Sequence, residues 1–133
     1  MNASKTFPAA AVLGLLLAAV PNQSHADVKD YEFRLVQNEV KKGDAAVVAV
    51  RLINKKTGKP VPDAVISAKR IDMAPDGMAT MDAPLEQLPS DEAGVYRFKA
   101  NLSMAGRWQL SLGAKVQGET GTVQNKLVLK ALP

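Results

Sequence analysis

Three methionines stand close together in the segment Met73-Ala-Pro-Asp-Gly-Met78-Ala-Thr-Met81. Thioether sulfur is a soft ligand that prefers Cu(I) to hard cations. Pro75 and Gly77 bend the chain between the sulfurs, so the three side chains can converge on one ion. The spacing therefore predicts a Cu(I) or Ag(I) site with Met73, Met78 and Met81 as ligands.

Further candidate ligands accompany these methionines. Met104, in the segment Asn101-Leu-Ser-Met104-Ala-Gly106, is a possible fourth thioether if its turn lies at the same end of the fold. Carboxylates that complete the shell or attract the cation are available at Asp72, Asp76 and Asp82.

Packing is the alternative role for all four methionines, because methionine is flexible and polarisable and fills irregular gaps well. In that interpretation Met73 ends a strand and points inward, Met78 and Met81 close the open end of the fold, and Met104 covers Trp108. Spacing alone does not separate the two interpretations.

The N-terminal residues 1–26 have the pattern of a secretory signal peptide. Lys5 precedes an apolar run from Phe7 to Val20, and Ser24 and Ala26 supply small residues before a cut. The run is about 14 residues, shorter than the roughly 20 that span a bilayer. We therefore expect a periplasmic domain over residues 27–133 without a membrane span, with an uncleaved anchor as the alternative.

Cleavage would remove His25, the only histidine, from a chain that has no cysteine. Residues 27–133 then lack the partners for Ser-His or Cys-His catalysis and the usual ligands of structural zinc. The acidic turn at Asp91 and Glu92 is better explained by solvation than by acid–base chemistry. We expect no enzyme, and no nucleic-acid binding, because the basic residues form no stripe with aromatic neighbours.

The residues after the signal predict an all-β domain. Short stretches with alternating or β-branched apolar residues, separated by turn signals, predict strands. They are residues 31–37, 45–53, 64–71, 94–100, 106–112 and 123–129.

Six or seven short strands in about 100 residues predict an immunoglobulin-like antiparallel β-sandwich. We expect Trp108 in its core and an irregular loop through the methionine segment as far as Pro89. The strands either side of Met104 are predicted to form a hairpin. Tyr96 loosely resembles a tyrosine corner, although Asp91 is not at the usual spacing.

Residues 66–112 resemble the small exported domains of the YtkA-like, or FixH-like, family. The similarity rests on the methionine segment, on Gly94-Val-Tyr96-x-Phe98, and on Met104-Ala-Gly106-Arg-Trp108. The resemblance implies a sandwich with a Met/Pro/Gly-rich loop, and partners among envelope metal-efflux or oxidase-assembly proteins. This chain differs in having Asp76-Gly77 between its methionines and no histidine in the loop.

Two hypotheses of function follow. The first is a periplasmic Cu(I)- or Ag(I)-binding accessory or metallochaperone-like protein that uses the methionines. The second is a metal-free interaction domain that docks an envelope partner through the same loop or through exposed strand edges. A carrier of small ligands has little support, because no polar constellation is present to orient one.

Overall fold

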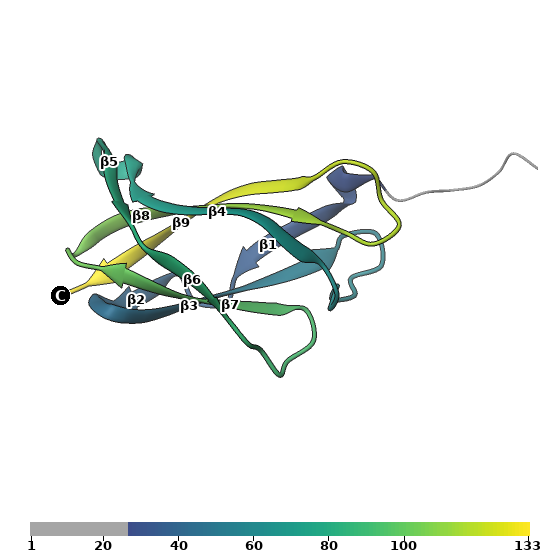
Figure 1. Cartoon of the computed structure of the whole chain (residues 1–133), viewed down its shortest axis with the longest axis horizontal. Helices are drawn as coiled ribbons and strands as arrows, with labels where there is room; N and C mark the ends of the chain where they lie inside the picture. Colours follow the sequence, from purple (N-terminus) through teal and green to yellow (C-terminus); the bar gives the residue numbers. More distant parts are fainter. Residues whose placement is uncertain (1–26) are drawn as a thin grey trace, which may run out of the picture.

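The computed structural model describes residues 27–133, which fold as two β-sheets packed face to face (Figure 1). The predicted signal peptide, residues 1–26, lies outside the described residues, so its cleavage remains a prediction. Among residues 27–133, no helix is long and apolar enough to cross a membrane.

The first sheet has four antiparallel strands in the order β1-β3-β7-β6. Their bounds are β1 (Tyr31–Leu35), β3 (Gly43–Asn54), β7 (Val95–Leu102) and β6 (Leu85–Leu88).

The second sheet has five strands in the order β2-β9-β8-β4-β5, antiparallel except where β2 pairs with β9. Its strands are β2 (Glu39–Lys41), β9 (Val123–Leu132), β8 (Gly106–Lys115), β4 (Val65–Met73) and β5 (Met78–Ala83). Two short 3-10 helices, η2 (Val28–Asp30) and η3 (Ala74–Asp76), complete the elements of the described residues. This strand order confirms the predicted immunoglobulin-like sandwich.

Each edge of the sandwich is formed by a segment that changes sheets. On one side the chain passes from β1 in the first sheet to β2 in the second, and on the other from β5 in the second to β6 in the first. Pro84 is the single residue between β5 and β6. Proline has no N–H to donate to a ladder and is tolerated at sheet edges, so this position suits it.

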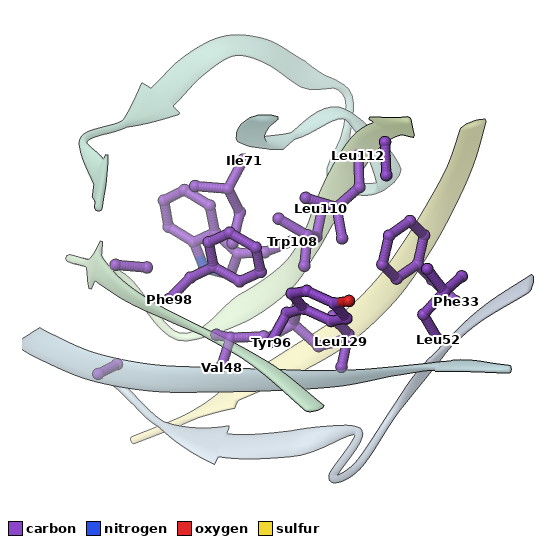
Figure 2. Close-up of a cluster of buried hydrophobic side chains, with 14 of the residues drawn as sticks. Phe33, Val48, Leu52, Ile71, Tyr96, Phe98, Trp108, Leu110, Leu112 and Leu129 are labelled. Atoms are coloured by element: carbon purple, nitrogen blue, oxygen red, sulfur yellow. The ribbon is translucent and has the colours of Figure 1, made fainter. Parts of the chain in front are cut away.

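The core lies between the sheets and follows from the two-residue period of the strands. Val48, Val50 and Leu52 alternate along β3, Trp108 and Leu110 along β8, and all five are buried. Figure 2 shows the aromatic and aliphatic side chains of both sheets meeting in this layer. Trp108 is 1% exposed, which confirms the prediction that it is a core residue.

Tyr96 anchors the segment that joins β3 to β4. Its hydroxyl donates to the Val61 carbonyl at 2.6 Å and accepts from the Ala64 N–H at 3.0 Å. Burial raises the pKa of Tyr96, partly opposed by the Ala64 N–H, so the hydroxyl keeps its proton. The bonded carbonyl lies 35 residues upstream. Tyr96 therefore fixes the segment that crosses from β3 to β4. In a tyrosine corner, by contrast, the hydroxyl bonds backbone only a few residues upstream.

Two expectations about connections were wrong. The segment after η3 is not an irregular loop, because residues 78–88 form β5 and β6 around Pro84. β7 and β8 do not form a hairpin, because they belong to different sheets. The turn that holds Met104 therefore crosses from one sheet to the other over the end of the core.

Candidate functional site

Met73 is the last residue of β4 and is 0% exposed. It follows Ile71, also fully buried, at the two-residue interval that places both side chains on the inner face of the sheet. The Met73 thioether is thus enclosed in the core, in the orientation that the packing interpretation predicted.

Met78 faces Met73 across the β4–β5 pair. The two residues are cross-strand partners, joined by η3 and by Gly77, which adopts a φ of +78°. Left-handed backbone of this kind is strained for residues other than glycine. Met78 is half-buried and packs against the core.

Met81 lies further along β5, where the strand departs from regular pairing. The register shifts between the Met73–Met78 pair and the Asp72–Asp82 pair, so residues 79–81 have no partner opposite them on β4. Met81 is half-buried against the core, like Met78. Both side chains therefore have one side in the core and part of their area open to solvent.

Met104 is the most exposed of the four, with 40% of its surface open to solvent. Its main-chain carbonyl accepts a hydrogen bond from the indole N–H of Trp108 at 3.1 Å. The backbone of Met104 thus satisfies the buried tryptophan, and its side chain remains available at the surface.

Gly106 brings the Met104 turn against the β4–β5 hairpin. A Cβ at this position would lie 2.7 Å from both Met73 Cε and Asp76 Oδ2, and the residue has a φ of +141°. Only glycine allows so close an approach. Figure 1 shows β5 and the start of β8 at the same end of the sandwich, which is the condition on which Met104 was considered as a fourth ligand.

The carboxylate of Asp76 forms an ion pair with Arg107. Its Oδ2 accepts from the Arg107 backbone N–H and its Oδ1 from the Arg107 Nε–H, both at 2.8 Å. Arg107 Nη2 also donates to the Pro75 carbonyl at 2.7 Å. The backbone N–H and then the guanidinium lower the pKa of Asp76. These bonds fasten η3 to the first residues of β8.

Arg70 engages the other two carboxylates. Its Nε donates to Asp72 at 2.8 Å, its Nη1 to Asp82 at 3.2 Å, and its Nη2 to the Ala79 carbonyl at 2.8 Å. Asp72 is 5% exposed and also accepts from the Ala74 N–H at 2.9 Å. Arg70 therefore fastens β5 to β4 on the face opposite the core.

The flanking carboxylates thus each pair with an arginine, which competes with any cation for their oxygens. Within residues 27–133, no group of three His, Cys, Asp or Glu side chains is arranged to hold a metal ion. The thioethers are the soft ligands that this end of the molecule offers a cation. We call Met73, Met78, Met81 and Met104 the methionine cluster.

Sequence reasoning missed the two arginines that shape the site. Arg70 lies in the predicted strand 64–71 and Asp72 directly follows that strand, so their two-residue spacing was a usable signal of a shared face. The Arg107–Asp76 pair is separated by 31 residues, and nothing local indicated it.

Comparison with known proteins places the chain in a family. A family model described as YtkA-like matches residues 25–113, which extend from before η2 into β8 and include the whole methionine cluster. No curated protein matches the sequence. The match extends well beyond residues 66–112, on which the resemblance rested. The chain belongs to the YtkA-like family.

Proposed function

We propose that this chain is an exported accessory protein of the periplasm that binds Cu(I) or Ag(I) through the methionine cluster. The observation that carries the proposal is the convergence of two distant segments. β4–β5 pairing joins Met73 to Met78, and Gly106 packs the Met104 turn against Met73. Family membership and the pattern of residues 1–26 support the envelope setting.

Exposure divides the four thioethers between two roles. Met78, Met81 and Met104 are the proposed ligands, because each has part of its side chain at the surface. Met73 is fully buried, so we assign it to packing beneath them. It becomes a ligand only if the hairpin moves away from the core.

The surroundings favour a soft ion over a hard one. Hard divalent cations need several oxygen ligands, and the three nearby carboxylates are held by Arg70 and Arg107. Thioethers are neutral and prefer Cu(I). Ion transfer to a partner would proceed by exchange of these weak bonds, with no catalytic step.

A competition titration tests the proposal. Protein beginning at Asp27 is titrated with Cu(I) in the presence of a chromophoric chelator of Cu(I). Leucine replaces methionine with similar volume but without sulfur. The triple variant Met78→Leu, Met81→Leu, Met104→Leu is expected to lose binding, and the matched control Met73→Leu to retain it. Wild-type affinity in the triple variant would refute the proposal.

A metal-free docking domain is the second candidate, and one observation favours it. Met73, Met78 and Met81 all pack with the core, which is a sufficient role for these thioethers without an ion. The partner would be an envelope protein of metal efflux or oxidase assembly, as the family resemblance implies. Capture of the same partner by wild type and by the triple leucine variant, in the presence of a chelator and with no metal bound, would favour this candidate.

A further inference from the structure

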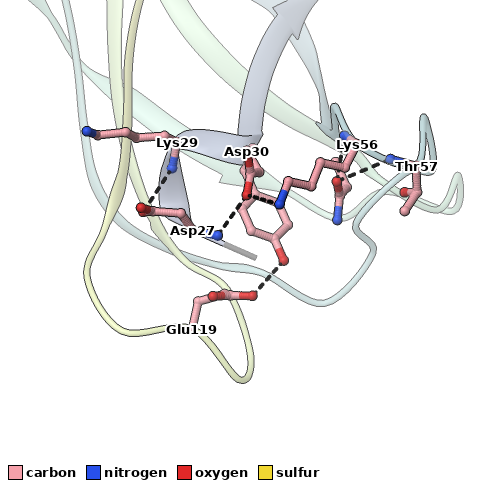
Figure 3. A network of polar contacts seen from close by, with 8 residues as sticks. Asp27, Lys29, Asp30, Lys56, Thr57 and Glu119 are labelled. Atoms are coloured by element: carbon pink, nitrogen blue, oxygen red, sulfur yellow. Dashed lines mark hydrogen bonds and ion pairs between the residues drawn. The ribbon is translucent and has the colours of Figure 1, made fainter. Parts of the chain in front are cut away.

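The first residues of the described chain are fixed by a local hydrogen-bond network. The backbone N–H of Asp27 donates to Asp30 Oδ2 at 2.8 Å, and Asp27 Oδ1 accepts from the Lys29 N–H at 3.4 Å. These reciprocal bonds form a capping box around η2. Figure 3 shows Asp27, Lys29 and Asp30 in this arrangement.

Asp30 is also linked to the rest of the fold. Its carboxylate lies 3.5 Å from Lys56 Nζ, and its carbonyl accepts from the Lys55 N–H at 2.7 Å. The adjacent Tyr31 hydroxyl donates to Glu119 at 2.9 Å. The nitrogen of Asp27 therefore already points at a carboxylate that is itself bound to the rest of the fold.

We propose that proteolytic processing between Ala26 and Asp27 creates a structural ion pair, in which the new α-ammonium of Asp27 binds the Asp30 carboxylate. The inference rests on the export included in the proposed function. In the hydrolysis, water adds its oxygen to the Ala26 carbonyl carbon as the C–N bond breaks. Ala26 leaves as a carboxylate, and the Asp27 nitrogen gains protons to become an ammonium.

The geometry needs no rearrangement to accept this change. The Asp27 nitrogen is already 2.8 Å from Asp30 Oδ2, within the usual range for a charge-assisted bond. The hydrogen bond from the Asp27 N–H is the largest of the causes that lower the pKa of Asp30. A positive charge at the same nitrogen acts in the same direction.

The pair should stabilise the domain in a defined pH window. Pairing raises the pKa of the α-ammonium above its ordinary value of about 7.7–8.0. Its stabilisation is therefore complete below that range and is lost as the pH rises through the folded-state pKa. At the acid end, it is lost as Asp30 becomes protonated, below the ordinary aspartate pKa of 3.8.

Four proteins isolate the charge. One chain begins at Asp27 and one at Ser24, which keeps the Asp27 amide N–H but moves the ammonium three residues away. Each is made with Asp30 and with Asp30→Asn. At pH 6.5 and low salt, we expect the Asp27 chain to melt about 2–4 °C above the Ser24 chain. The difference should vanish with Asp30→Asn and at pH 10.

Equal melting temperatures for the two starts, or a difference that persists in Asp30→Asn, would overturn the ion pair. The intact mass of the protein recovered from the periplasm tests the processing itself. A mass for a chain that begins at Asp27 supports it, and any other start contradicts it. Neither readout involves metal, so failure here is distinguishable from failure of Cu(I) binding.

Discussion

Gly106 is the residue on which the geometry of the methionine cluster depends most directly. It lies where the turn from β7 enters β8, and its missing side chain leaves room for Met73 Cε and Asp76 Oδ2. One glycine therefore sets how closely the Met104 turn approaches the hairpin. Gly118 offers a comparison, because it also has a positive φ, of +86°, but faces open space.

Gly106→Ala is expected to lower the free energy of unfolding by more than Gly118→Ala. Both variants place a side chain on backbone at positive φ, and such a conformation costs a non-glycine residue about 1–3 kcal/mol. Gly106→Ala adds overpacking against Met73 and Asp76, a further 1–3 kcal/mol or so. Urea denaturation measures both values. Equal decreases in the free energy of unfolding for the two variants would show that the close packing at Gly106 does not contribute to the difference.

Asp76 makes the stability of this end dependent on pH. Its pKa is lowered by the Arg107 backbone N–H and guanidinium. Its stabilisation is therefore present above the unfolded-state pKa and is lost as the pH falls through the folded value, below 3.8. Asp76→Asn should be less stable than wild type at pH 6, and the gap should narrow on acidification towards pH 3.

Chemical denaturation of both proteins across this range checks the expectation. Asp91→Asn, which removes an exposed carboxylate from the turn before β7, serves as the control for the loss of one negative charge. A wild-type advantage over Asp76→Asn that is constant with pH would contradict the assigned ion pair.

At the scale of elements, β5 is an edge strand held by a single arginine on its outer face. Arg70 reaches Asp82 and the Ala79 carbonyl on β5 while it pairs with the buried Asp72 of its own strand. Backbone pairing between β4 and β5 is interrupted by the register shift, and these side-chain bonds join the two strands across the interruption.

Arg70→Met should therefore destabilise the protein by about 1–3 kcal/mol, because buried Asp72 would keep the Ala74 N–H but lose its guanidinium donor. In the Arg70→Met variant, the backbone amides of β5 should also exchange hydrogen faster than the backbone amides of β3 and β7. Arg34→Met breaks only an exposed pair with Glu32 on one strand, and we expect a loss within about 1 kcal/mol. Similar exchange profiles for the two variants would argue against the role of Arg70.

The long central strands and the edge strand β1 were predictable from sequence, and the edge strands β2, β5 and β6 were not. β3 and β8 carry alternating or β-branched residues over many positions, which specifies strand and inner face together. β2 is too short to give a periodic signal, and the prolines at positions 84 and 89 masked β6. The short separation of β7 and β8 in the sequence also led to the wrong prediction that they pair, because a short turn can cross between sheets as well as join a hairpin.

The candidate site also has parts that the sequence predicts and parts that it does not. The four methionines were identifiable by type and spacing, and the inward phase of Ile71 and Met73 was already implicit in the strand pattern. The pairing of the carboxylates with arginines was not, because Asp82 meets Arg70 only through strand register and Asp76 meets Arg107 only through the tertiary fold.

At the scale of the whole molecule, the two proposals concern opposite ends of the sandwich. Figure 1 shows η3 and β5 at one end, and the chain entering the described domain at the other. An attachment or processing event at Asp27 therefore leaves the methionine cluster free to meet an ion or a partner. This separation also lets each proposal be tested without disturbing the other.

The most direct test of metal binding observes the four thioethers separately. Residues 27–133 contain only the methionines of the cluster, so protein labelled with ¹³C at the methionine ε-methyl groups gives four signals to follow during Ag(I) titration. We predict saturable shifts of the Met78, Met81 and Met104 signals at one equivalent, with Met73 little changed. Four signals that stay in place as Ag(I) is added would contradict the metal-binding function.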